Sequence, residues 1–163
     1  MSRNEATLHL LCGKIAAGKS TLSAELAQRP ATVVISEDHW LSRLYRDEMK
    51  SVSDYLRCSA RLREAMRSHL VALLQAGVSI VLDFPANTPG QRAWMRTIFE
   101  QAQSAHQLHF LDVPDAICKA RLRARNASGD HDFAATDEEF EQITSYFVAP
   151  TPEEGFNLVR HAP

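Results

Sequence analysis

The chain has 163 residues, a hydrophobic content of 45% and a formal net charge of −2. This length suits one domain with its own core, and the slightly acidic balance argues against general affinity for nucleic acid or acidic membranes. No apolar run approaches the roughly 20 residues of a membrane span, and we identify no signal peptide ahead of the first predicted strand, so we expect a cytoplasmic protein.

The segment from Gly13 to Ser20 fits the phosphate-binding P-loop pattern G-x-x-x-x-G-K-[ST]. An apolar run over residues 8–12 precedes it and a helical pattern over residues 20–28 follows it, as the motif requires. We expect Lys19 to reach the β- and γ-phosphates of ATP and the Ser20 hydroxyl to bind Mg²⁺. The predicted nucleotide-binding residues of this loop are Gly13, Lys14, Ile15, Ala16, Ala17, Gly18, Lys19, Ser20 and Thr21.

Strands and helices alternate along the rest of the chain. Strands are predicted at residues 31–35, 78–82 and 108–111, with a short fifth strand within 156–159. Helices are predicted weakly at 41–50, then at 53–76, at 88–105, from Pro114 onward and at 136–147, with a polar loop at 126–135. Thr88 with Gln91, and Thr136 with Glu139, have the spacing of capping boxes.

This alternation predicts an α/β, three-layer P-loop NTPase fold. It would have a mostly parallel five-stranded sheet, helices on both faces and a small lid at about residues 121–136. We expect residues 1–163 to form a single P-loop kinase domain. Ligands of such sheets bind beyond the carboxyl ends of the strands, which places the P-loop, Asp38 and Asp83 along one rim.

Asp38 is the candidate general base. A kinase needs a carboxylate that accepts or orients the proton of the acceptor hydroxyl, and Asp38 lies just past the second predicted strand. The alternative is a structural role, either as a helix N-cap or in an ion pair with Arg43. Glu37 is the second choice for the base.

Asp83 is the candidate metal residue at the end of the third predicted strand. It would hold Mg²⁺ through water or support the acceptor, and the alternative is a turn residue ahead of Pro85. Phe84 follows it where hydrolytic ATPases generally carry a water-activating group, which favours transfer over hydrolysis.

Basic residues cluster ahead of the predicted loop, at Lys119, Arg121, Arg123 and Arg125. A closing lid could supply such cations to the migrating phosphoryl group, and Arg121 and Arg125 have the i, i+4 spacing of one helix face. Basic residues also complement the C-terminus of a helix, and both interpretations can hold together.

Other chemically distinctive residues receive structural interpretations. The three cysteines lack a C-x-x-C spacing and are expected to be reduced thiols: Cys12, Cys58 and Cys118. His106 and His109 have no second ligand pair at a suitable spacing, so no zinc site is predicted. A solvated helix face is expected for Arg57, Arg61, Arg63 and Arg67, with the second interpretation that one of them faces the acceptor cleft.

Several motifs occur in the order found in P-loop kinases of the phage polynucleotide kinase type. They are Gly13–Thr21, Ser36-Glu37-Asp38, Val81-Leu82-Asp83, Leu111-Asp112-Val113-Pro114 and Arg121-x-x-x-Arg125-Asn126. The chain thus resembles this group, whose relatives include zeta toxins, chloramphenicol phosphotransferases and small ATP-binding proteins of the AAA family. The resemblance covers nearly the whole chain, although only the P-loop is specific by itself. It implies Asp38 as general base, Arg121 as a clamp on the nucleotide and Arg125 as the lid arginine.

Two features of the resemblance bear on the ligands. The tail Pro150–Phe156 looks like that of small kinases in this group and is expected near the adenine. Polynucleotide kinases carry an arginine three residues after the base, where this chain has Leu41, and Arg43 is a possible substitute. The departure counts against an acceptor that is a 5′-hydroxyl nucleic acid end.

The sequence therefore predicts an ATP- and Mg²⁺-dependent kinase that phosphorylates a hydroxyl of a small molecule, with Asp38, Lys19 and Arg125 as catalytic residues. A nucleic-acid or nucleotide 5′-hydroxyl kinase and a non-catalytic ATP-binding module are the alternatives. The sequence carries no diagnostic motif for the acceptor, for ATP over GTP or for the oligomeric state.

Overall fold

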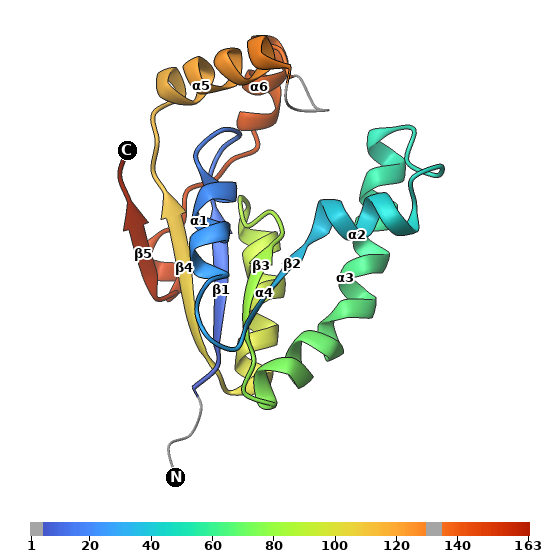
Figure 1. Cartoon of the computed structure of the whole chain (residues 1–163), viewed down its shortest axis with the longest axis vertical. Coiled ribbons are helices and arrows are strands. Elements are labelled where there is room, and N and C mark those ends of the chain that lie inside the picture. The colour runs from blue at the N-terminus through green and yellow to red at the C-terminus, as the bar shows by residue number, and fades with distance from the viewer. Residues whose placement is uncertain (1–4, 130–134) are drawn as a thin grey trace.

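The structure is a computed structural model that describes residues 5–129 and 135–163. Its centre is a five-stranded sheet with the order β2-β3-β1-β4-β5, in which all neighbouring strands are parallel (Figure 1). The strands are β1 (Thr7–Cys12), β2 (Thr32–Ser36), β3 (Ser79–Asp83), β4 (Ala105–Leu111) and β5 (Leu158–His161). The predicted α/β fold with a parallel five-stranded sheet is confirmed.

Helices cover both faces of the sheet and its carboxyl edge (Figure 1). Helix α1 (Lys19–Leu26) packs on one face, and α3 (Val52–Gln75) and α4 (Pro89–Ala102) pack on the other. Helix α2 (Glu37–Leu44) extends from β2 toward α3, while α5 (Asp115–Ser128) and α6 (Asp137–Thr144) lie together beyond the carboxyl ends of the strands. A short 3₁₀ turn, η1 (Pro152–Glu154), precedes β5.

Successive residues of a strand point to opposite faces of the sheet, so the strands contribute side chains to two separate cores. Leu10 belongs to the large cluster shared with α3 and α4, whereas its neighbour Leu11 packs with Leu26 of α1. A third cluster joins the P-loop residue Ala17 to Leu122 of α5 and Phe140 of α6. This third cluster fixes the α5–α6 pair above the P-loop.

The helix predicted weakly at 41–50 is wrong at both ends. Helix α2 begins at Glu37, directly after β2, and ends at Leu44. The cap is Ser36, whose hydroxyl oxygen accepts a hydrogen bond from the His39 N–H at 3.3 Å. Because Ser36 is also the last residue of β2, the strand passes into the helix without a loop.

The predicted loop at 126–135 begins too early, because α5 continues to Ser128. The interval 130–134, which is part of the predicted lid, lies outside the described residues. The expected solvated arginine face of α3 is correct for Arg57 and Arg61, but Arg63 and Arg67 are half-buried. Arg67 donates hydrogen bonds to Thr97 of α4.

The two predicted capping boxes have different outcomes. The box of Thr136 and Glu139 is complete. At α4 the Thr88 hydroxyl accepts from the Gln91 N–H, but the Gln91 side chain accepts from the Asn87 N–H instead of closing the box on Thr88. Among residues 5–129 and 135–163, no helix is both long enough and apolar enough to cross a membrane.

Candidate active site

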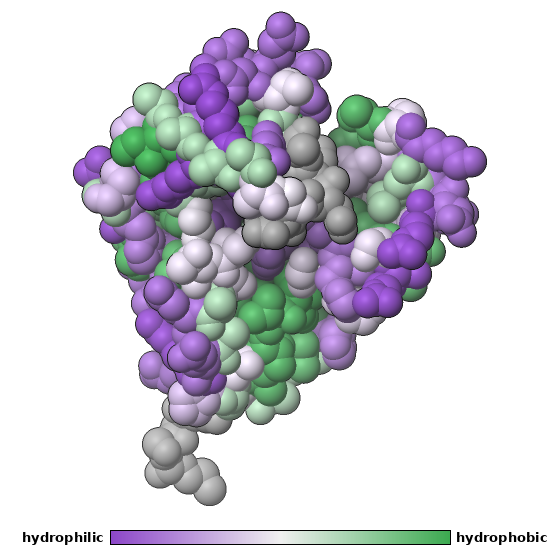
Figure 2. All heavy atoms as spheres, turned by 45° about the horizontal axis from the view of Figure 1, so that its top comes forward, coloured by the Kyte–Doolittle hydropathy of each residue, from purple (hydrophilic) through white to green (hydrophobic). Residues whose placement is uncertain are grey.

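A cavity of about 870 Å³ opens at the carboxyl edge of the sheet. It is lined by the P-loop, the start of α1, Asp38, residues of α5 and the end of the chain from His161 to Pro163. Figure 2, in which this end is turned toward the viewer, shows the surface notched between two hydrophilic lobes. Of the predicted rim, the P-loop and Asp38 line this cavity, whereas Asp83 is not one of its lining residues.

The P-loop adopts a backbone that depends on its glycines. Gly18 has a φ of 106°, in the left-handed region where a side chain is strained. A Cβ on Gly13 would lie 3.2 Å from the Ala17 Cβ and 3.3 Å from the Leu111 Cβ, closer than packed carbons normally approach. The Gly13 N–H donates to the Asn87 side-chain oxygen at 3.0 Å, which ties the loop to the segment after β3.

Lys19 lies at the base of this loop. Its Nζ donates to the carbonyl oxygens of Gly13 and, at 3.0 Å, of Lys14. Burial lowers the pKa of Lys19, while the nearby Asp83 carboxylate acts in the opposite direction. Within the described part of the chain no carboxylate forms an ion pair with Lys19, so its charge is available to an anion in the cavity.

Asp38 and Asp83 lie on neighbouring elements. Asp38 is exposed in the first turn of α2 and lines the cavity, and because Ser36 is the cap, Asp38 is not the N-cap of α2. Burial raises the pKa of the half-buried Asp83, and the Asp38 carboxylate adds to this effect while Lys19 opposes it. The structure thus brings Asp83 within electrostatic reach of both Asp38 and Lys19.

Glu37, the second choice for the base, is 2% exposed and does not line this cavity. Its carboxylate accepts hydrogen bonds from the hydroxyls of Tyr55 and Ser59 on α3. Adjacent residues on a helix point about 100° apart, which explains why Asp38 faces the P-loop and Glu37 does not. Arg43 is exposed on the last turn of α2.

Arg121 and Arg125 of α5 both line the cavity. The Arg121 guanidinium donates to the carbonyl oxygens of Ala16 and Ala17 at 3.4 and 3.3 Å. The Nε of Arg125 is buried and has no hydrogen-bond partner among residues 5–129 and 135–163. A buried donor without an acceptor costs free energy, and an oxyanion in the cavity would relieve that cost.

The other two cations of the basic cluster have structural partners. Lys119 pairs with Glu141 at 2.5 Å and Arg123 pairs with Asp137, so both attach α5 to α6. The cluster therefore divides into two residues that face the cavity and two that hold the helices together.

The AAA domain family has a sequence model that matches residues 8–150, which is most of the chain. The chain belongs to the AAA domain family. A search of curated proteins finds no match to the sequence.

Solved kinase structures share the fold of this AAA domain. The APS kinase CysC of Mycobacterium tuberculosis, in complex with AMPPNP and APS, is 20% identical with a TM-score of 0.65, and the match covers 98% of this chain and 89% of that one. A sugar kinase of Janibacter sp. HTCC2649 is 15% identical with a TM-score of 0.63, over 96% and 85% of the chains. The Pnkp1/Rnl/Hen1 RNA repair complex contains a chain that is 16% identical with a TM-score of 0.67, over 89% of this chain and 45% of that one. At these identities the likeness establishes the P-loop kinase fold.

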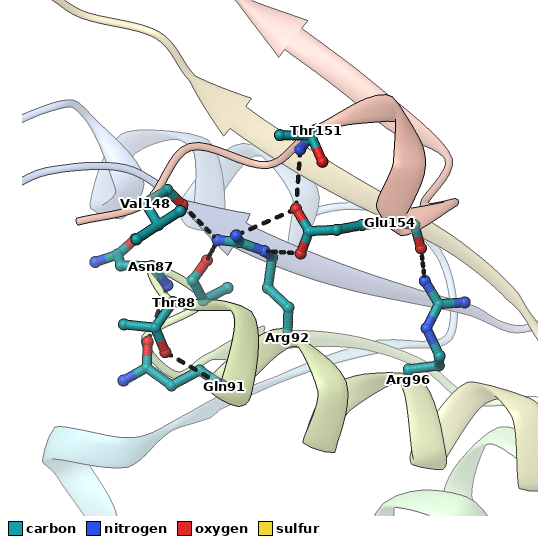
Figure 3. Close-up of polar contacts among 9 residues, drawn as sticks. Asn87, Thr88, Gln91, Arg92, Arg96, Val148, Thr151 and Glu154 are labelled. Atoms are coloured by element: carbon teal, nitrogen blue, oxygen red, sulfur yellow. Dashed lines mark hydrogen bonds and ion pairs between the residues drawn. The ribbon is translucent and has the colours of Figure 1, made fainter. Parts of the chain in front are cut away.

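The tail from Pro150 to Phe156, which the resemblance led us to expect near the adenine, does not line the cavity. Its Glu154 forms hydrogen bonds with Arg92 of α4, and it is the chain end at His161–Pro163 that lines the cavity. Arg92 of α4 is fully buried and donates to both oxygens of the Glu154 carboxylate, at 2.8 and 3.2 Å (Figure 3). It also donates to the carbonyl oxygens of Ala86 at 3.0 Å and Val148 at 2.8 Å.

Arg92 was missed by sequence reasoning. It lies on the buried face of α4 with Met95, Ile98 and Phe99, and a charged residue at an apolar position of a helix was the available signal.

A row of histidines across three strands was also missed. His109 shares one hydrogen bond with His9 at 3.0 Å and another with His161 at 2.9 Å. Burial lowers the pKa of His109 to about 4, with the neighbouring histidines and Arg29 adding to the effect. Within the described residues no group of histidine, cysteine and acidic side chains is arranged to hold a metal ion, and Cys12, Cys58 and Cys118 are buried free thiols.

Proposed function

We propose that this AAA domain is an ATP- and Mg²⁺-dependent kinase that transfers the γ-phosphate of ATP to a hydroxyl of a small-molecule acceptor. The proposal is carried by one observation, the cavity that the P-loop, Asp38, Arg121 and Arg125 line together. Its volume of about 870 Å³ is that of a small-molecule site and is ample for a nucleotide.

The nucleotide end of the cavity is well supplied with positive charge. The backbone N–H groups of the loop and of the first turn of α1 are suited to phosphate oxygens, because the start of a helix carries partial positive charge. Lys19 and the two arginines add full charges, and the unpartnered Nε of Arg125 fits a phosphate oxygen. The residues from His161 to Pro163 would form a wall for the rest of the nucleotide.

The residues present also fit a magnesium ion. The Ser20 hydroxyl and the Asp83 carboxylate offer oxygen ligands, which Mg²⁺ prefers, and this ion usually takes only one or two protein ligands beside phosphates and water. Such an ion, when bound, would neutralise negative charge on the phosphates.

Asp38 would orient the acceptor hydroxyl. As the acceptor oxygen bonds to the γ-phosphorus and the bond to the ADP oxygen breaks, the hydroxyl proton would pass to the Asp38 carboxylate. Lys19 and Arg125 would stabilise the charge on the transferred group.

Transfer of labelled γ-phosphate from ATP into a pool of metabolites, compared with release of free phosphate, tests the activity. Asp38→Asn should lower kcat by about 10²- to 10⁴-fold with unchanged ATP affinity. Asp47→Asn, at an exposed residue outside the cavity, is the matched control. If Asp38→Asn transfers phosphate at the wild-type rate, the base assignment is wrong, and ATP binding with no transfer at all would indicate a nucleotide-binding module.

A polynucleotide kinase is the second candidate, because the fold is shared with a chain of the Pnkp1 complex. Leu41 disfavours it, since this side chain is 2% exposed in the core and offers no group to an acceptor phosphate. Labelling of an oligonucleotide with a 5′-hydroxyl end would overturn the small-molecule assignment.

A further inference from the structure

A second and smaller cavity, of about 30 Å³, lies between the start of α2, α3, the turn after β3 and α4. Glu37 of its lining precedes Asp38, and Phe84 and Pro85 follow Asp83. Tyr55 of the same lining is close enough to Asp38 for that carboxylate to raise the pKa of Tyr55, and no residue of this cavity lines the larger one. An acceptor whose hydroxyl reached Asp38 could therefore extend toward this cavity.

Arg63 of α3 lines this cavity and has no polar partner among the residues that the structure describes. Its Nε is buried without a hydrogen bond, and its guanidinium lies over the Trp94 ring with the Cζ 5.9 Å from the ring centroid. Across the described ranges, no carboxylate forms an ion pair with it. Stacking on an aromatic ring fixes a guanidinium plane while leaving its N–H edge free for an anion.

The acid in the same cavity is already satisfied. Glu37 accepts from the Tyr55 hydroxyl with one carboxylate oxygen and from the Ser59 hydroxyl, at 2.9 Å, with the other. Burial and Glu37 raise the pKa of Tyr55, and the Asp38 carboxylate adds to this effect, so the phenol stays protonated and keeps donating. Of the two charged side chains in this cavity, Arg63 is therefore the one that still needs a hydrogen-bond partner.

We propose that the acceptor is an anion whose oxyanion group is bound by Arg63 in this cavity. The proposal rests on the kinase function proposed above and names the substrate class of the same site. A volume of about 30 Å³ has room for roughly two water-sized groups, which suits a terminal oxyanion and excludes a ring. The body of the acceptor would then lie between this cavity and Asp38.

The test divides a metabolite extract by anion exchange into a retained anionic fraction and a neutral flow-through. Each fraction is offered to the protein with γ-labelled ATP, and phosphate transfer is measured for the wild type and for Arg63→Gln. The matched control is Arg61→Gln, on the same helix but exposed and outside both cavities. Thermal melting of each variant shows whether it is folded.

We expect transfer from the anionic fraction. Arg63→Gln should reduce transfer about 10- to 100-fold, the range for a lost hydrogen bond to a charged group, through a higher KM for the acceptor with an unchanged KM for ATP. Arg63→Lys should recover part of the loss, and Arg61→Gln should stay within about twofold of the wild type, as a surface substitution does.

Transfer only from the neutral fraction, or equal rates for Arg63→Gln and the wild type, would overturn the inference and leave the kinase function standing. Transfer from neither fraction would overturn the kinase function and this inference with it.

Discussion

Replacing Glu154 by alanine would leave the Arg92 guanidinium charged and fully buried, with its hydrogen bonds to the carbonyl oxygens of Ala86 and Val148 but without its carboxylate partner. Removal of one partner of a buried ion pair costs about 3–5 kcal/mol. Because the Glu154 side chain is 22% exposed and water can partly replace it, we expect the lower end, about 3 kcal/mol. For a chain of this length about 1 kcal/mol shifts Tm by about 2–4 °C, so Tm should fall by about 6–12 °C.

Thermal unfolding followed by circular dichroism measures this effect. Glu154→Gln keeps the shape and one acceptor and should lose about half as much stability. Glu153→Ala is the matched control, because this neighbouring acid of η1 is exposed and should shift Tm by less than about 2 °C. Equal shifts for the two alanine variants would refute the reasoning.

The pH dependence of the same pair has a definite sign. Burial raises the pKa of Glu154. Hydrogen bonds from Arg92 and the Thr151 N–H, together with the charges of Arg92 and Arg96, have the opposite and larger effect, so the pKa lies below its usual value of 4.5. A lowered carboxyl pKa contributes stability above the unfolded-state value that is lost as the pH falls through the folded-state value. The Tm difference between wild type and Glu154→Ala should therefore shrink as the pH falls below about 4.5.

Three further predictions concern the P-loop and the histidine row. Lys19→Ala should lower kcat by about 10²- to 10³-fold with little change in Tm, while Lys50→Ala, at an exposed position, should change neither. Gly18→Ala should reduce stability by about 1–2 kcal/mol in denaturant titration, because its φ of 106° strains any side chain. Burial lowers the pKa of both His9 and His109 from 6.5 to about 4, so the unfolded chain binds more protons over this range and Tm should fall as the pH is lowered from 6.5 to 4. His9→Gln should flatten this fall, and an unchanged slope would show that the histidine row does not cause it.

What the sequence predicted well was encoded locally. The P-loop, the strand positions and the Thr136 capping box depend on residues a few positions apart, and the structure has the predicted sheet and capping box. The contacts that were missed join residues far apart in the chain. Arg92 and Glu154 are 62 positions apart, and only the path of the tail past α4 makes them partners.

The histidine row and the start of α2 show two other reasons for failure. His9 and His109 meet because of the register between β1 and β4, which no spacing in the sequence reveals. Helix α2 was placed too late because Ser36 ends a strand and caps a helix at once, whereas sequence patterns lead one to expect a connecting loop. The position of Asp38 depends on where α2 begins, because a later start of the helix would place Asp38 in a turn.

The direct passage from β2 into α2 has a mechanical consequence. Strand β2 is one of the two edge strands of the sheet and, among the described residues, pairs with β3 alone, so Glu37 and Asp38 directly follow a strand that is supported on one side. No loop separates β2 from α2, so a ligand in either cavity that displaces α2 also strains the backbone hydrogen bonds of β2 from Thr32 to Ser36. Hydrogen exchange of the β2 amide protons would therefore change when a ligand binds beside Asp38 or Glu37.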